Sequence, residues 1–180
     1  MDRVRLATIW LGGCSGCHMS FLDLDEFLID LADIVDVVYG PVVDPKEYPD
    51  NVDICLIEGA VCSDEHIHHV KNIRAKTKIV VAFGDCAVTG NVPAMRNPLG
   101  KVGSILQEIY CDRPDAQGQM PGEKGLMPVL IDTVVPVHKV IKVDAFLPGC
   151  PPPASRIKEF VQLALSGAEL KLQGSGLKPG

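Results

Sequence analysis

Short hydrophobic runs recur along the chain at intervals that suit alternating strands and helices. Apolar residues dominate five such segments, and Gly, Pro or Asp residues bound most of them. Runs of this length between turn-forming residues are typical of buried strands. The sequence therefore predicts strands over residues 4–11, 34–39, 52–57, 79–83 and 143–147.

Between these strands, hydrophobic positions recur at helical spacing. Phe21, Leu24 and Leu28 fall on one face of a helix, and Ser20 can cap its first turn. Ser63 likewise predicts a capped, polar helix that continues to about residue 76. Two more helices are predicted over residues 101–110 and 154–165, whereas residues 134–141 could run along the sheet or pack against a partner.

The alternation of strands and helices defines the fold class. It indicates an α/β, flavodoxin-like doubly wound parallel sheet with helices on both faces. The length suits one domain, so we expect a single domain over residues 1–180, with a core over about 4–165 and a loosely held tail over 167–180. The polar stretch 113–125 is predicted to be a surface excursion and not a domain boundary.

Charge and composition exclude several classes of function. The formal net charge is -6 and no segment is dense in Lys or Arg, which argues against nucleic-acid binding and against a membrane-surface patch. No apolar run approaches the roughly 20 residues of a membrane span, and the predicted first strand begins too early to leave room for a signal segment. We therefore expect a cytoplasmic protein, and its hydrophobic content of 47% hints at a partner surface.

The cysteines carry the candidate chemistry. There are seven, an odd number in a chain without a secretory signal, so thiolate chemistry is favoured over disulfides. Cys14, Cys86 and Cys150 each come shortly after a predicted strand, and doubly wound sheets bind ligands outside the carboxyl ends of their strands. Cys17 forms a Cys-x-x-Cys loop with Cys14, which can serve two irons. The sequence therefore predicts one 4Fe–4S cubane held by Cys14, Cys17, Cys86 and Cys150.

Three alternatives compete with the cubane. Four cysteines also suit structural zinc, but zinc ribbons pair two Cys-x-x-Cys knuckles, whereas one knuckle and two distant single cysteines are present. A thioredoxin-like pair at Cys14 and Cys17 would leave Cys86 and Cys150 without a role. FMN binds flavodoxin-like folds, but the first loop carries cysteines in place of the hydroxyls that would hold its phosphate.

The remaining cysteines have more ordinary interpretations. Cys55 in mid-strand and Cys111 at the end of a helix are predicted to pack in the core, because a free cysteine usually behaves as a small buried hydrophobe. Cys62 lies in a loop near the same sheet edge as the four candidate ligands. It is the one credible substitute ligand.

Two polar residues near the predicted ligands keep two interpretations each. Glu58 closes a strand at the same edge, where it could relay protons or bond to groups around the cluster, or could be satisfied by a loop amide or by solvent. His18 could donate a hydrogen bond toward the cluster or a partner, or could be structural. Three further histidines lie on one polar helix without a grouping that defines a zinc site, so we expect a solvated or interface face at His66, His68 and His69.

Five motifs in order resemble those of the nickel-iron hydrogenase small subunit. They are Cys-Ser-Gly-Cys-His-Met-Ser over residues 14–20, Leu-Asp-Leu-Asp-Glu over 22–26, Glu-Gly at 58–59, Gly-Asp-Cys-Ala over 84–87 and Pro-Gly-Cys-Pro-Pro over 148–152. The resemblance runs from residue 4 to about residue 165. The histidine after the second cysteine and the acidic helix that follows look most like the soluble, bidirectional NAD-reducing type.

This resemblance implies an electron-carrying subunit that does no bond chemistry itself. It implies that the predicted cubane is the proximal cluster, and that a large subunit holds the nickel-iron centre where hydrogen is split. Iron-sulfur and flavin diaphorase subunits would then hold FMN and bind NAD. Respiratory uptake subunits carry two further clusters, but no cysteine follows Cys150 in this chain, so we expect one cluster.

The nearest alternative is the small iron-sulfur subunit of respiratory complex I, or an electron relay in another hydrogenase-like assembly. The complex I subunit has adjacent cysteines where this chain has Cys14-x-x-Cys17. That family therefore fits less well.

Overall fold

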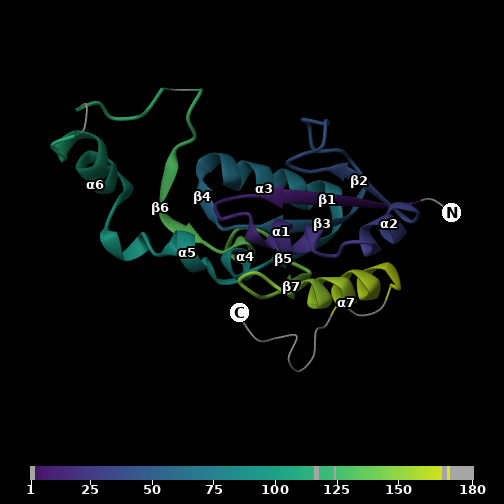
Figure 1. Ribbon diagram of the computed structural model, residues 1–180. Coiled ribbons are helices and arrows are strands. Elements are labelled where there is room, and N and C mark those ends of the chain that lie inside the picture. Colours follow the sequence, from purple (N-terminus) through teal and green to yellow (C-terminus); the bar gives the residue numbers. More distant parts are fainter. Residues whose placement is uncertain (1–2, 116–117, 124, 168–169, 171–180) are drawn as a thin grey trace.

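A five-stranded parallel sheet organises the protein. The computed structural model describes residues 3–115, 118–123, 125–167 and 170 (Figure 1). The strands follow the order β2-β1-β3-β5-β7, which is the flavodoxin order once the separate strand β4 is set aside. The predicted fold class is therefore confirmed. The strands are β1 (Val4–Trp10), β2 (Val35–Tyr39), β3 (Val52–Glu58), β5 (Thr77–Phe83) and β7 (Ala145–Leu147).

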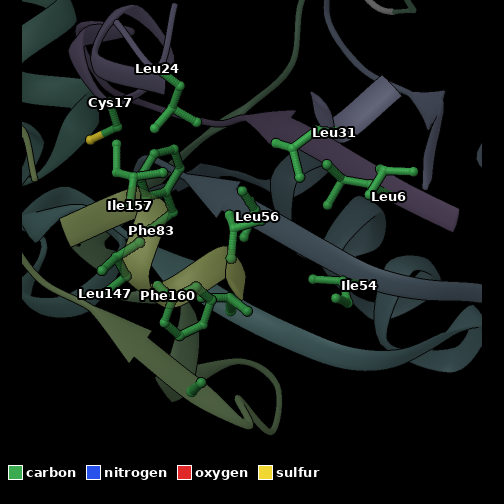
Figure 2. Packing of buried hydrophobic residues seen from close by; sticks show 14 residues of the cluster. Leu6, Cys17, Leu24, Leu31, Ile54, Leu56, Phe83, Leu147, Ile157 and Phe160 are labelled. Carbon is green, nitrogen blue, oxygen red and sulfur yellow. The ribbon is translucent and has the colours of Figure 1, made fainter. Parts of the chain in front are cut away.

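Helices cover both faces of this sheet. On one face, Ile157 and Phe160 of α7 (Ala154–Leu165) pack against Leu56 and Phe83 of the sheet (Figure 2). The helices α1 (Gly16–Leu22) and α2 (Phe27–Ala32) lie on the same face. The helices α3 (Asp64–Lys76) and α4 (Asp85–Thr89) cover the opposite face, together with a 3-10 turn over Val137–Lys139.

The central strands are apolar because both of their faces are buried. From Ile54 to Glu58, every residue of β3 is buried, and the last four residues of β5 are buried as well. Continuous apolar runs are typical of parallel strands covered on both sides. This is why the hydrophobic pattern located both ends of all five strands within two residues.

The predicted single helix after the first cysteine loop is wrong. Helix α1 already begins at Gly16, so Ser20 lies inside it and does not cap it. The Ser20 hydroxyl donates to the carbonyl oxygen of Pro152 at 2.6 Å instead. The chain then breaks at Asp25, whose φ is 50°, before α2 begins at Phe27. Two short helices can share one hydrophobic spacing, so periodicity alone could not reveal the break.

A separate two-stranded antiparallel ribbon packs against one face of the sheet. It pairs β4 (Val61–Ser63) with β6 (Leu130–Val135), so the segment 134–141 does not run along the sheet. Helix α5 (Asn91–Ala94) lies next to α4, and α6 (Val102–Gln107) lies on the far side of the ribbon (Figure 1). A 3-10 turn (Asn97–Leu99) precedes α6, and a π-helical turn (Glu108–Asp112) follows it. The Arg96 guanidinium donates to the carbonyl oxygen of Ile131 at 2.5 Å, which joins the segment after α5 to strand β6.

The remaining predicted segments fall partly outside the described residues. Within 113–125, the described residues are exposed apart from the half-buried Pro121. The predicted tail lies outside the described residues except for positions 167 and 170. In the portion of the chain that the structure describes, no helix is long and apolar enough to cross a bilayer.

Candidate metal centre

Four cysteines from three distant segments meet at the carboxyl edge of the sheet. Cys14 follows β1, and Cys17 lies in the first turn of α1. Cys86 lies in the first turn of α4, directly after β5, and Cys150 follows β7. Cys17 and Cys86 are buried, whereas Cys14 and Cys150 are exposed. The group therefore has an inner and an outer side.

The four thiols are close enough to interact electrostatically. Burial raises the pKa of Cys17, and the charges of Glu58, Cys86, Cys14 and Cys150 raise it further. Burial also raises the pKa of Cys86; a backbone hydrogen bond opposes this shift, and the charges of Cys14, Cys150 and Glu58 add to it. Such thiols become thiolates when a bound metal compensates their negative charge. The electrostatics of the group therefore suit a bound metal better than free thiolates.

Glycines let the backbone approach the sulfur atoms closely. Gly84 has a φ of 82°, and a Cβ built on it would lie 2.1 Å from the Cys17 sulfur. A Cβ on Gly16 would lie 3.2 Å from the Cys14 sulfur. Gly149 has a φ of 143°, and its Cβ would lie 2.5 Å from the Cα of Pro152. A bulky inorganic cluster needs such a side-chain-free cradle.

Hydrogen bonds join the loops that carry Cys86 and Cys150. The Asp85 carboxylate accepts from the Gly149 N–H at 2.6 Å, and the Asp85 N–H donates to the Gly149 carbonyl at 2.9 Å. The Asn91 side-chain amide donates to the Cys150 sulfur at 3.3 Å. The amino-acid sequence alone did not predict these roles of Asp85 and Asn91. The position of Asp85 directly before a cysteine was the one available signal.

Glu58 and His18 form a buried pair beside Cys17. Glu58 is 3% exposed, and its carboxylate accepts from the N–H groups of Cys17 at 3.3 Å and His18 at 3.0 Å. It also pairs with Nδ1 of His18. The carboxylate is thus satisfied by loop amides and does not face solvent. A proton relay at Glu58 stays a prediction.

The donor set fits a cubane better than a single metal ion. Within the described ranges, no three His, Cys, Asp or Glu side chains are grouped to hold one metal ion. A cubane makes a different demand, because it distributes four thiolates over four irons. Four thiols on three loops, with a glycine cradle, meet that demand.

The other three cysteines lie apart from this group. Cys55 is fully buried, and burial raises its pKa to about 12, as the core-packing prediction requires. Cys111 lies in the π-helical turn and is only half-buried, so its predicted core packing is wrong. The Cys62 thiol donates to the carbonyl oxygen of Ala60 at 3.3 Å. Burial raises its pKa and Arg96 opposes that, with no contribution from the four thiols.

The predicted histidine face on α3 is partly buried. His68 is exposed, but His66 and His69 are half-buried. The Cys62 N–H donates to Nδ1 of His66 at 3.2 Å, and the His69 ring packs near the rings of Tyr39 and Tyr48. The Ser63 hydroxyl accepts from the His66 N–H, which confirms the predicted cap.

With the fold and the thiol group described, the class of protein follows. The family model for the 20 kDa subunit of NADH ubiquinone oxidoreductase matches residues 14–164. That range covers most of the chain, including all four of these cysteines. The chain belongs to this family.

Particular relatives are hydrogenase subunits. The chain is 39% identical over 171 residues to a vhu subunit of the F420-non-reducing hydrogenase of Methanocaldococcus jannaschii, covering 94% of this chain and 58% of that protein. It therefore spans little more than half of that relative. It is 36% identical over 179 residues to the NAD-reducing hydrogenase HoxS subunit delta of Cupriavidus necator, covering 96% of this chain and 84% of that protein.

A solved structure matches over the full length. A chain of an NAD+-reducing [NiFe]-hydrogenase in the H2-reduced state superposes with a TM-score of 0.93 at 37% identity, covering 99% of this chain and 100% of that chain. The [NiFeSe] hydrogenase from Desulfovibrio vulgaris Hildenborough superposes with a TM-score of 0.61 at 19% identity, covering 92% of this chain and 60% of that chain. The second match shows a shared fold only.

Proposed function

We propose that this chain is the electron-transfer small subunit of an NAD-reducing nickel-iron hydrogenase. Cys14, Cys17, Cys86 and Cys150 hold one 4Fe–4S cluster, the cluster proximal to the nickel-iron site of a large subunit. A diaphorase module with iron-sulfur and flavin subunits receives the electrons and passes them to NAD, or supplies them in the reverse direction. The nickel-iron centre, FMN and NAD belong to these partners.

One observation carries the proposal. Four thiols lie together at the carboxyl edge of the sheet. The chain that forms this sheet matches a chain of an NAD+-reducing [NiFe]-hydrogenase over its full length. Carboxyl edges of doubly wound sheets are where such folds bind their ligands. Thiolates are the ligands that iron-sulfur clusters take from proteins.

The residues of this chain hold and surround the cluster. When bound, a cubane takes up and gives back single electrons, so this chain needs no nucleophile or general base. The cradle at Gly84 and Gly149 makes room, and the bonds between Asp85 and Gly149 fix two ligand loops relative to each other. Exposed apolar side chains occur on the elements that carry or adjoin the ligand loops, at Trp10 of β1, Met19 of α1 and Met95 after α5, and they suit a subunit interface there.

A second candidate is an electron relay in a different assembly. The identity to the F420-non-reducing hydrogenase subunit is 39%, slightly above the 36% to the NAD-reducing subunit. The family description also includes a subunit of NADH ubiquinone oxidoreductase. The cluster site would be the same in each case, and the partner chains and final acceptor would differ.

Metal analysis and spectroscopy of the purified complex test the cluster. Replacing Cys14, Cys17, Cys86 or Cys150 with Ala should remove or convert the cubane, because one iron loses its protein thiolate. Cys55→Ser, Cys62→Ala and Cys111→Ser are the matched controls and should retain it. Loss of the cubane electron paramagnetic resonance signal in Cys62→Ala, with retention in Cys86→Ala, would contradict the ligand assignment.

Hydrogen-driven reduction separates the two candidates. The complete complex should reduce NAD under hydrogen, whereas this chain with its large subunit alone should reduce an artificial dye and leave NAD untouched. If the complete complex reduces the dye but never NAD, the second candidate is correct. Absence of nickel from every co-purified chain would favour a complex I-type relay.

A further inference from the structure

The Glu58 carboxylate is buried where a negative charge acts directly on the thiol group. It ends β3, paired in register with Trp10 of β1 and Phe83 of β5, at the sheet edge that carries the cysteines. The rings of Trp10 and Phe83 also pack around His18, the partner of Glu58, with centroid separations of 5.3 and 6.0 Å. Both members of the pair are buried.

The carboxylate occupies two backbone donors next to a ligand. The N–H groups of Cys17 and His18 both donate to Glu58. Hydrogen bonds to the sulfurs of an iron-sulfur cluster tune its potential, because they stabilise its negative charge. Donors held by Glu58 are not available to the cluster.

We propose that the negative charge of the Glu58 carboxylate lowers the reduction potential of the cubane, an inference that rests on the proposed function. Reduction adds one electron to the cluster, and a buried carboxylate nearby opposes it. Coulomb interactions are several-fold stronger at a partly desolvated site than in water. Its hold on the two N–H groups acts in the same direction.

The electrostatics of the thiols agree with this direction. Besides burial, the Glu58 charge raises the pKa of both Cys17 and Cys86, so it opposes negative charge at two of the four ligands. The geometry of His18 keeps the carboxylate in place. Nε2 of His18 is buried without a hydrogen-bond partner among the described residues, so Nδ1 makes the contact of the ring with Glu58. The pair is therefore anchored through Nδ1 and Glu58, which fixes the carboxylate beside the cluster.

The test is the midpoint potential of the cubane in the assembled complex, followed by electron paramagnetic resonance during redox titration. Glu58→Gln keeps an acceptor oxygen for the two N–H groups but removes the charge. We expect its cubane to be reduced more easily, by about tenfold in the reduction equilibrium, or about 59 mV for one electron. Glu58→Asp keeps the charge and should stay close to wild type.

A matched control lies on the same strand. Asp53 of β3 carries a partly buried carboxylate at the opposite end and accepts from the Arg5 N–H at 2.9 Å. Asp53→Asn should therefore leave the potential unchanged. An equal positive shift in Asp53→Asn and Glu58→Gln would overturn the proposal, as would an unchanged potential in Glu58→Gln at full iron content.

A second variant keeps the proposal testable if Glu58→Gln fails to hold iron. His18→Gln leaves the carboxylate in place and removes its imidazole partner, so the potential should stay the same or become more negative. A positive shift in His18→Gln would overturn the proposal. If the wild-type complex itself shows no cubane, the proposed function fails. If the cubane is present but its potential does not change in Glu58→Gln, only the inference about Glu58 fails.

Discussion

Gly84 leaves no room for a side chain beside Cys17. Its φ of 82° belongs to a backbone region that is costly for other residues, and a Cβ there would lie 2.1 Å from the Cys17 sulfur. We predict that Gly84→Ala lowers the free energy of unfolding by about 1–3 kcal/mol from backbone strain alone. It should also displace the thiol and reduce iron per chain, as measured by thermal unfolding and metal analysis.

Gly103 provides the matched control. It lies in α6, and a Cβ built on it meets nothing within 4 Å. Alanine is favoured over glycine inside a helix by about 0.5–1 kcal/mol. Gly103→Ala should therefore keep full iron and equal or higher stability. Equal iron content in Gly84→Ala and Gly103→Ala would show that the cluster does not need a residue without a side chain at position 84.

Asn91 should act on the cluster with the opposite sign to Glu58. Its amide donates to the Cys150 sulfur at 3.3 Å, and such a bond stabilises negative charge on the sulfur. We predict that Asn91→Ala makes the cubane harder to reduce, by a few-fold in the equilibrium, in the same redox titration. A potential that rises, or does not move, would show that the amide does not bond to the ligand when the cluster is bound.

At the residue scale, the sequence predicted where the cysteine ligands lie in the fold better than it predicted which side chains contact each other. The convergence of Cys14, Cys86 and Cys150 could be predicted because each follows a strand, and strands are visible as apolar runs. The pairing of Glu58 with His18 could not, because it joins residues 40 positions apart through the exact packing of α1 on the sheet. The half-buried position of Cys111 depends on a π-helical turn that has no sequence signature.

At the element scale, strands and uninterrupted helices were predictable, whereas irregular elements were not. Helix α7 has the predicted bounds because its apolar spacing continues without interruption from Ala154 to Leu165. The break between α1 and α2 depends on a positive φ at Asp25, which a non-glycine residue rarely signals. The pairing of β4 with β6 joins segments far apart in sequence and leaves no local pattern.

Asp144 joins three elements and should make stability depend on pH. It accepts from the Val80 N–H of β5 at 2.9 Å and from Arg74 of α3, just before β7 begins. Desolvation pushes the pKa of Asp144 up, but these bonds outweigh it and hold the pKa below its ordinary value. A depressed pKa stabilises the folded state above the unfolded value of about 3.9, and this contribution is lost as the pH falls through the folded value.

We predict that Asp144→Asn lowers the free energy of unfolding by about 1–2 kcal/mol at pH 7. The difference from wild type should shrink as the pH falls below about 4. Thermal unfolding of iron-free protein at several pH values measures both effects without interference from acid loss of iron. Asp36→Asn is the control, because Asp36 pairs with Arg3 on an exposed surface where ion pairs contribute little. A difference that grows on acidification would contradict the assigned pKa direction.

At the scale of the whole molecule, the two ends of the sheet differ. The carboxyl edge carries the thiols, α4 and α5, whereas α2 leads into the amino end of β2, whose Val35 pairs with Val4 at the start of β1 (Figure 1). Exposed apolar side chains occur at both ends, so exposure alone does not locate a partner. The position of the thiols does, because electrons must leave the cluster through the surface nearest to it.

The matched pair Met95 and Ile29 tests this asymmetry. Each residue is 71% exposed, but Met95 is the C-cap of α5, the helix whose first residue, Asn91, bonds to the Cys150 sulfur, whereas Ile29 lies on α2. A buried, unpaired charge at an apolar interface costs several kcal/mol. Met95→Glu should therefore reduce nickel per chain after size-exclusion chromatography of the complex by tenfold or more, whereas Ile29→Glu should leave it unchanged. If Met95→Glu retained its nickel and Ile29→Glu lost it, the large subunit would bind the opposite end of the sheet, and the assignment of the thiol edge as its interface would be wrong.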